Sequence, residues 1–156
     1  MLNRPLCPPL PPPIFIFIFP TAKSRSSLIT IILDLGILKK FTIGRILSSV
    51  PNKISEPAEL CHIGQSWNWD GVQFDILSPE SNTNFKGNNA SCVLKISSEN
   101  GSLLLTGDIE KKAEKNLLQN SGIDLDADVI LIPHHGSKTS STKAFIQSVS
   151  PDIAIS

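Results

Sequence analysis

The sequence predicts one modest α/β domain in which a mixed sheet is flanked by helices. Two short apolar runs, 103–105 and 129–132, are typical of buried strands. Between them, segment 109–120 places apolar residues at the spacing of an amphipathic helix. Two buried strands joined by a helix form the repeating unit of an α/β layer, and reactive groups gather at the strand ends of such layers.

Length and charge set limits on the function. The chain has 156 residues, which is enough for one domain with a core of its own. Fourteen basic residues balance fourteen acidic ones, so no overall field favours a nucleic acid or a membrane surface. Any contact with a polyanion must therefore be local.

The first residues differ in composition from the rest. Seven of the twelve prolines fall within residues 1–20, around the apolar run 14–19. Six apolar residues cannot span a bilayer, which takes about 20. We therefore expect residues 1–27 to be a disordered or non-native Pro-rich leader and residues 28–156 to form the domain.

The first half of the domain contains strand and turn patterns. β-branched runs predict strands at 28–33 and 43–50. The segment between them is too short to assign by period, although Leu35, Leu38 and Phe41 would share one helix face. Apolar residues alternate on both sides of Asp70-Gly71, which predicts a β-hairpin over 66–77 with one buried aromatic face. Strands are expected at 92–96 and 102–106, after a polar loop.

The second half continues the alternation of helix and strand. In helix 109–120 the predicted buried stripe contains Ile109, Ala113, Leu117 and Leu118, and Gly122 ends the helix. A strand at 129–132, a loop and a helix at 143–149 follow. Residues 151–156 resemble a strand that begins as the chain ends, which suggests a truncated domain.

Three cysteines leave two interpretations open. Cys7, Cys61 and Cys92 show neither zinc-knuckle spacing nor a disulfide framework. Free cysteines are commonly buried, so we favour three unpaired thiols, one or two of them in the core. A Cys61–Cys92 bridge is the alternative.

Asp108 and the pair His134-His135 follow the two buried strands. A carboxylate after Gly107 can approach a metal or a substrate closely, although it can also serve as a helix N-cap. Adjacent residues in an extended chain point to opposite sides, so one imidazole can face the site while the other packs behind it. Because the strands are consecutive, we favour a functional site over a structural role.

A loop rich in hydroxyl groups follows the histidines and leads into a helix. Backbone N–H groups at a helix start, together with hydroxyl donors, can seat a phosphate or another anion. Ordinary loop and capping chemistry is the alternative for this loop and for Asn89, which precedes another strand. The candidate substrate-binding residues are Gly136, Ser137, Lys138, Thr139, Ser140, Ser141 and Asn89.

Four motifs carry a resemblance to a known family. In order along the chain they are Trp-Asn-Trp-Asp-Gly-Val (67–72), Asn-Asn-Ala-Ser-Cys-Val-Leu (88–94), Leu-Leu-Leu-Thr-Gly-Asp-Ile-Glu (103–110) and Pro-His-His-Gly-Ser-Lys-Thr-Ser-Ser-Thr (133–142). Together they resemble the C-terminal metallo-β-lactamase-like domain of ComEC-type competence proteins, over roughly residues 35–156.

The resemblance implies a partial αβ/βα sandwich and a place in a membrane channel protein that takes up single-stranded DNA. By position, Asp108 matches a metal-binding carboxylate, and His134 or His135 matches the late histidine ligand. In the intact family the domain lies outside the cytoplasmic membrane and is a hydrolase of the incoming strand that uses a divalent metal, manganese or zinc, and no small-molecule cofactor. Its partners would be single-stranded DNA and the membrane channel portion.

One departure from the family bears on activity. The upstream metal motif, His-x-His-x-Asp-His or a variant, is absent, because no histidine precedes His62. A catalytic zinc needs about three protein ligands and an open position, and a two-metal site needs more. We therefore expect weak or no metal binding and no nuclease activity from this chain alone. A non-catalytic phosphate-binding module and a non-functional gene remnant are the alternatives.

Overall fold

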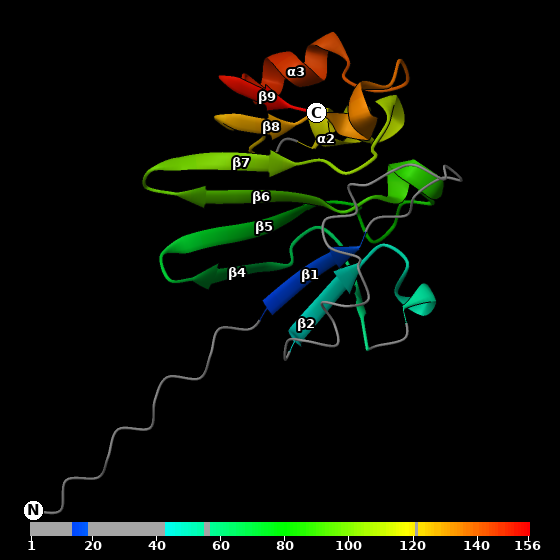
Figure 1. The fold of residues 1–156 in the computed structure, drawn as a ribbon. Coiled ribbons are helices and arrows are strands. Elements are labelled where there is room, and N and C mark those ends of the chain that lie inside the picture. Colours follow the sequence, from blue (N-terminus) through cyan, green and yellow to red (C-terminus); the bar gives the residue numbers. More distant parts are fainter. Residues whose placement is uncertain (1–13, 19–42, 55–56, 121) are drawn as a thin grey trace, which may run out of the picture.

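The computed structural model describes residues 14–18, 43–54, 57–120 and 122–156 (Figure 1). A six-stranded sheet contains β4 (Ser66–Trp69), β5 (Val72–Ser78), β6 (Val93–Ser98), β7 (Gly101–Leu105), β8 (Val129–Leu131) and β9 (Ile153–Ile155), in that order. A smaller sheet contains β1 (Ile14–Ile18), β2 (Ile43–Ser48) and β3 (Glu59–Leu60). The helices are α2 (Lys111–Gln119), α3 (Lys143–Val149) and the 3-10 turns η1 (Pro51–Lys53), η2 (Gly87–Ala90) and η3 (Pro133–Gly136).

The larger sheet is mixed, as the sequence predicts. Strands β4 to β7 pair antiparallel, and β7, β8 and β9 pair parallel. The turn at Asp70-Gly71 joins β4 to β5 and confirms the predicted hairpin. The predicted strand 28–33 and the unassigned segment that follows it, up to residue 42, lie outside the described residues.

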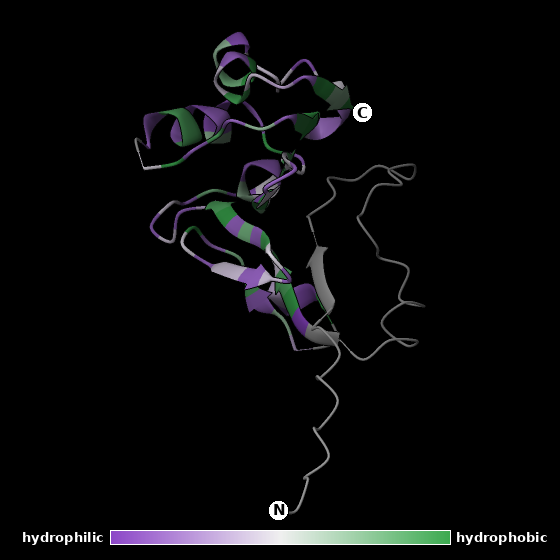
Figure 2. Cartoon of the chain, turned by 90° about the vertical axis from the view of Figure 1, so that its left-hand side faces the viewer, coloured by the Kyte–Doolittle hydropathy of each residue, from purple (hydrophilic) through white to green (hydrophobic). Residues whose placement is uncertain are grey.

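The central strands of the larger sheet pack on both faces, and successive side chains of a strand point to opposite sides. One face packs under α2 and α3 around Leu104, Ile130 and Phe145. The other face packs against β2 around Leu47, Ile76 and Leu94. In Figure 2 the helical ribbons contain both hydrophilic (purple) and hydrophobic (green) residues, as expected of helices that pack one face on a sheet. The described residues therefore form a helical layer, a central sheet and a small second sheet.

The small sheet includes part of the predicted leader. Residues Ile14–Ile18 form β1 and pair parallel with β2. We predicted a disordered or non-native leader over residues 1–27, although the alternation of isoleucine and phenylalanine in this stretch is typical of a strand. The other residues of 1–27 lie outside the described residues.

A disulfide joins Cys61, just after β3, to Cys92, just before β6. Both residues are fully buried, and their Cα atoms are 6.0 Å apart. Our preference for unpaired thiols was therefore wrong, and the alternative bridge is the one formed. The two cysteines meet because the segment after β3 packs on the central sheet, which their spacing in the sequence does not reveal.

The hairpin β4–β5 buries only part of its aromatic surface. Trp67 stacks on Phe74, directly opposite in the register, with ring centroids 5.1 Å apart. Trp69, on the same predicted face, is 42% exposed. The prediction of one buried aromatic face is therefore met in part by Trp67, which is half-buried against the core, and is wrong for Trp69, which lies next to the turn.

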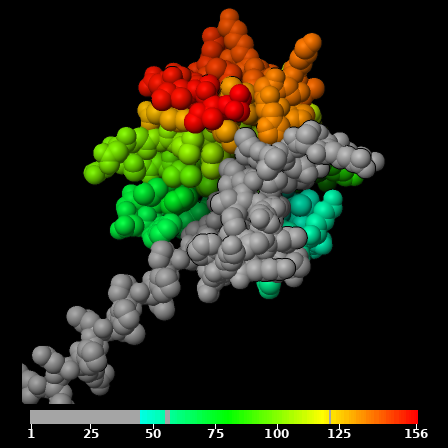
Figure 3. Space-filling view, in the orientation of Figure 1, coloured from blue at the N-terminus to red at the C-terminus, as the bar shows by residue number. Residues whose placement is uncertain are grey.

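The predicted C-terminal strand is β9, at one edge of the larger sheet. Its residues are exposed, including Ile153 and Ile155. In the space-filling view the C-terminal residues, coloured red, lie on the surface beside the preceding orange segment (Figure 3). Within the described part of the chain, no helix combines the length and the apolar character needed to cross a membrane.

An ion pair on the helical side of the sheet predicts a pH dependence. Lys95 Nζ lies 2.6 Å from Asp124 Oδ2, and this hydrogen bond holds the pKa of Asp124 below the ordinary value of an aspartate. A depressed carboxyl pKa stabilises the fold above the unfolded pKa, and that stability is lost as the pH falls through the folded pKa. Because the Asp124 side chain is 77% exposed, we expect Asp124→Asn to cost less than about 1 kcal/mol at pH 7. Denaturant unfolding at pH 7 and below pH 3 should show this cost shrinking in acid; an equal cost at both values would contradict it.

Candidate functional site

The ends of β7 and β8 bring the predicted site residues together. The two strands are parallel neighbours, with Leu105 opposite Leu131, so the loops that follow them leave the same edge of the sheet. Thr106 Oγ1 donates to the Leu131 carbonyl at 2.6 Å. The His134 backbone N–H donates to the Gly107 carbonyl at 3.1 Å. These bonds hold the Asp108 loop against the histidine turn.

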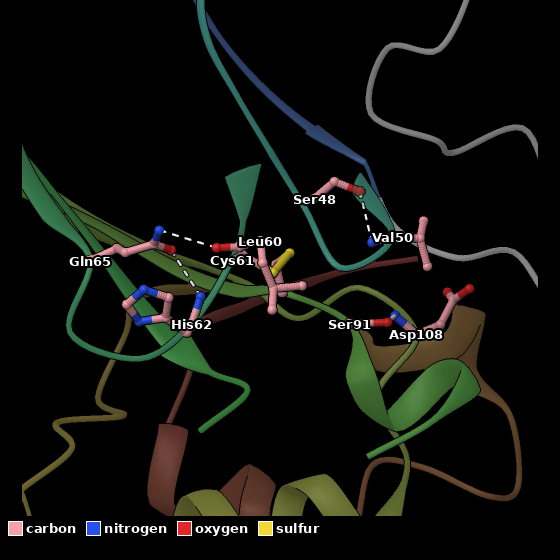
Figure 4. The surroundings of a disulfide bond; sticks show 9 residues. Ser48, Val50, Leu60, Cys61, His62, Gln65, Ser91 and Asp108 are labelled. Carbon is pink, nitrogen blue, oxygen red and sulfur yellow. Dashed lines mark hydrogen bonds between the residues drawn. A yellow bond between two sulfur atoms is a disulfide. The ribbon is translucent and has the colours of Figure 1, made fainter. Parts of the chain in front are cut away.

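Asp108 and His135 form the closest acid–imidazole pair of the predicted set. Asp108 Oδ1 lies 3.6 Å from His135 Nε2, and the two side chains are 15% and 43% exposed. The Asp108 backbone N–H donates to Ser91 Oγ at 3.3 Å, beside the disulfide at Cys92 (Figure 4). Asp108 is not the helix N-cap, because α2 begins at Lys111 and Glu110 occupies the cap position. The carboxylate is thus placed beside an imidazole and remains partly accessible.

The histidine turn differs from the extended chain that we expected. His134 and His135 have φ values of 49° and 52°, in the left-handed region, inside η3. Residues other than glycine adopt this region at a cost, and consecutive examples persist where the surroundings hold them. The two imidazoles have separate partners because of this tight turn and not because of strand alternation.

His134 belongs to a second group of side chains, which we call the Glu110 cluster: Asn88, Asn89, Glu110, His134 and Thr139. His134 Nδ1 lies 3.4 Å from Glu110 Oε1 and 3.3 Å from Thr139 Oγ1. Thr139 Oγ1 donates to the same Glu110 oxygen at 3.0 Å. On the other side of the ring, Asn88 Nδ2 lies 3.4 Å from His134 Nε2. Both ring nitrogens therefore face protein groups.

Asn89, a predicted substrate-binding residue, makes bonds to helix α2. Its Oδ1 accepts the backbone N–H groups of Glu110 at 3.3 Å and Ala113 at 3.0 Å. Its Nδ2 donates to Glu110 Oε2 at 3.2 Å. An amide from a distant loop thus does the work of an N-cap, and Asn89 keeps little capacity for a ligand.

The predicted anion seat in the loop 136–142 is partly filled by the protein itself. Glu114 on α2 is buried, and its carboxylate accepts the backbone N–H of Ser141 at 2.5 Å and of Thr142 at 2.9 Å. These are the donors that the start of α3 would offer to a phosphate. Ser140 Oγ also bonds inward, to the Pro133 carbonyl at 2.8 Å.

The rest of that loop is more open. Gly136, Lys138 and Thr139 are exposed, and Ser137 is half-buried with its hydroxyl 3.0 Å from Thr139 Oγ1. The structure therefore leaves the N-terminal half of the predicted loop available to a ligand. In the C-terminal half, the backbone N–H groups of Ser141 and Thr142 already donate to Glu114.

Sequence reasoning missed two acidic residues of the α2 region, the N-cap residue Glu110 and the helical residue Glu114. Glu110 and Glu114 are four positions apart and so lie on one helix face. Glu114 is buried with Ala113 and Leu117, whereas the predicted stripe residue Leu118 is exposed. The available signal was the place of Glu114 beside Ala113 in the predicted apolar stripe. A carboxylate at such a position needs hydrogen-bond donors from elsewhere in the fold.

The donor set fits part of a metal site. Two ligands of one zinc ion, each at about 2.0–2.2 Å, have donor atoms roughly 3.4 Å apart at a tetrahedral angle. The 3.6 Å between Asp108 Oδ1 and His135 Nε2 is close to that value. No group of three or more His, Cys, Asp or Glu side chains able to hold a metal ion occurs among the residues that the structure describes. The arrangement thus provides two positions, and a catalytic zinc needs about three.

The chain is similar in sequence to several competence proteins. It is 42% identical over 91 residues to "Competence protein ComA" of Neisseria gonorrhoeae, a match covering 58% of this chain and 13% of that protein. It is 40% identical over 95 residues to "Recombination protein 2" of Haemophilus influenzae, covering 61% and 12%. It is 42% identical over 84 residues to "ComE operon protein 3" of Bacillus subtilis, covering 54% and 11%.

These relatives are much longer than this chain, which spans about one eighth of their length or less. No family model matches the sequence. The sequence comparison confirms the similarity to competence proteins that the four motifs predict. The structure confirms an α/β domain with a mixed six-stranded sheet.

Proposed function

We propose that this chain is part of the metallo-β-lactamase-like domain of a DNA-uptake protein, and that Asp108 and His135 are two donors of its metal site. The observation that carries the proposal is the 3.6 Å between their side chains, at the ends of two parallel buried strands. The names of the competence relatives support the same assignment.

The substrate that we propose for the intact protein is single-stranded DNA. A divalent metal, manganese or zinc, would polarise a phosphodiester and activate a water molecule there. The longer relatives leave most of their length outside the match, and we propose the membrane channel portion of such a protein as the partner of this domain.

This chain alone is proposed to bind metal weakly and to leave DNA intact. Asp108 and His135 supply two donors, while His134 is engaged by the Glu110 cluster. Metal sites with fewer than about three protein ligands lack the geometry that holds a catalytic zinc. The remaining donors would have to come from another segment or another chain.

Metal binding and cleavage can be tested on the purified full chain. Elemental analysis after incubation with Mn²⁺ or Zn²⁺ should find less than one metal per chain, and a labelled single-stranded oligonucleotide should stay intact. Asp108→Ala and His135→Ala should each weaken the residual metal binding at least about tenfold. Asp126→Ala, at an exposed carboxylate, is the matched control.

Two results would count against the proposal. One metal per chain, with metal-dependent cleavage that Asp108→Ala abolishes, would show that the chain is an active nuclease. Residual metal binding that is unchanged in both Asp108→Ala and His135→Ala would show that these residues are not the donors.

The disulfide supports the outer side of the cytoplasmic membrane as the location of the domain. Disulfides form and persist in oxidising compartments and are rare in the cytosol of most organisms. Cys61 and Cys92 are both fully buried, so their bridge forms as part of the packed structure. A domain that folds with a core disulfide suits a site where DNA first meets the cell.

A second function, binding of phosphate without catalysis, has one observation in its favour. Lys138 is exposed in the half of the loop 136–142 that Glu114 leaves open. Phosphate contacts weaken steeply as salt is raised. Oligonucleotide binding that falls with salt and is reduced in Lys138→Ala, without any cleavage, would favour this function.

A further inference from the structure

The Glu110 cluster surrounds both nitrogens of the His134 ring with groups whose hydrogen-bonding roles can be worked out. A carboxylate can only accept hydrogen bonds when it is ionised. Thr139 Oγ1 donates its one proton to Glu110 Oε1 at 3.0 Å, so toward His134 Nδ1, at 3.3 Å, it can act only as an acceptor. Glu110 Oε1, 3.4 Å from the same nitrogen, is an acceptor too.

The opposite nitrogen faces a donor. Asn88 Nδ2 lies 3.4 Å from His134 Nε2. A neutral imidazole has one N–H and one bare nitrogen, and its neighbours decide which is which. Two acceptors lie beside Nδ1 and one donor lies beside Nε2. Both observations favour the tautomer with its proton on Nδ1.

We propose that Glu110 is a positioning residue that, in the neutral form of the His134 imidazole, holds the ring proton on Nδ1 and leaves a bare Nε2 facing Asn88. A bare imidazole nitrogen can accept a proton or bind a metal ion, and the other nitrogen of such a histidine is commonly oriented by a carboxylate. This inference deepens the proposed function. The position of the ring proton follows from the hydrogen-bonding groups alone, whereas a role for Nε2 in the site rests on the proposed function.

Asn88 is the group that any ligand on Nε2 has to displace. Its Nδ2 faces Nε2, and its Oδ1 is buried without a hydrogen-bond partner among the described residues. A buried amide oxygen without a partner carries a desolvation cost. The Asn88 side chain is therefore held less firmly than Asn89, whose Oδ1 accepts two backbone N–H groups.

Glu110 also joins the segments that shape the site. It links Asn89 of η2 through Oε2 and Thr139 of the loop after η3 through Oε1, at the start of α2. The Lys111 N–H adds a backbone bond to the Thr139 carbonyl at 3.0 Å. Glu110 thus holds the turn in which His134 adopts its left-handed backbone, next to His135.

Nitrogen-15 NMR of the histidine rings tests the proposal without metal or DNA. The chain has three histidines, so His134→Asn identifies the signals of His134 by their loss. In alkaline buffer, we expect wild-type His134 to show the pattern of one tautomer, with the proton on Nδ1. Glu110→Ala should shift His134 to the Nε2–H form that free imidazoles favour in water, and Glu110→Gln, which keeps an acceptor oxygen, should retain much of the wild-type pattern.

Two further variants separate positioning from folding. Thr139→Val removes only the second acceptor beside Nδ1, and it should increase the Nε2–H form even if Glu110→Ala fails to fold. Glu99→Ala, at an exposed carboxylate in the β6–β7 turn, should leave the pattern unchanged. Wild-type His134 with its proton on Nε2, or a pattern unaffected by both Glu110→Ala and Thr139→Val, overturns the proposal. Failure of the proposed metal site would appear instead in the metal-binding measurements on Asp108→Ala and His135→Ala, with these spectra unaltered.

Discussion

Replacing Cys92 with serine is expected to lower the free energy of unfolding by about 3–4 kcal/mol, the range for a cross-link that closes a loop of this length. Cys61 and Cys92 are 31 residues apart, and both are fully buried. The bridge ties the segment after β3 to the start of β6, so its loss frees the unfolded chain and loosens the contact between the two sheets. Denaturant unfolding of the full chain, followed by circular dichroism, measures the change.

The third cysteine provides the control. Cys7→Ser leaves the Cys61–Cys92 bridge intact and should keep the unfolding midpoint of the wild type in oxidising buffer. A reducing agent should lower the midpoint of wild type and of Cys7→Ser, but not that of Cys92→Ser. A cost below about 1 kcal/mol for Cys92→Ser, well under the usual range, would mean that the packing around Leu47 and Leu94 holds the sheets together without the bridge.

Replacing Glu114 with alanine should cost about 3 kcal/mol, since hydrogen bonds to a charged group contribute about 1.5–3 kcal/mol each and buried donors left alone are costly. The Glu114 carboxylate accepts the N–H groups of Ser141 and Thr142 at the start of α3. Without it, α3 loses its N-terminal acceptor and the loop after the histidines loses its link to α2. Thermal and denaturant unfolding check the magnitude.

A graded series sharpens the Glu114 experiment. Glu114→Gln keeps one acceptor oxygen and should cost less than Glu114→Ala. Lys115→Ala, one residue along α2 and exposed, should change stability by no more than about 0.5 kcal/mol. If phosphate at high concentration restored the stability of Glu114→Ala, the predicted anion seat would exist with Glu114 as its resident carboxylate. An equal, small cost for Glu114→Ala and Lys115→Ala would contradict the role of this buried group.

Hydrophobic spacing predicted most of the elements in the second half of the chain. The runs 103–105 and 129–132 correspond closely to β7 and β8, and helix 109–120 contains α2. Spacing was less reliable for the faces of these elements. Leu118 is exposed and Glu114 is buried, because the loop at Ser141 and Thr142 supplies donors that only the folded chain brings to α2.

The site shows the same division. Sequence order predicted that Asp108 and a histidine lie near one another, and the parallel pairing of β7 with β8 brings Asp108 within 3.6 Å of His135. The fact that His134 and His135 are neighbours in the sequence did not predict that their side chains have different partners. The left-handed turn and the Glu110 cluster separate them, and this cluster includes contacts between residues 21 and 46 positions apart in the chain.

By itself, the sequence determined the α/β class, the hairpin, helix α2, the strand ends that carry Asp108 and the histidines, and the likeness to competence proteins. These features depend on local propensity, on periodicity and on short motifs, which a linear chain displays. The tertiary structure decided the Cys61–Cys92 bridge, the burial of Glu114, the capping role of Asn89 and the partners of each imidazole. Each of these depends on contacts between groups distant in sequence, such as Asn88 with His134, and such contacts exist only once the layers have packed.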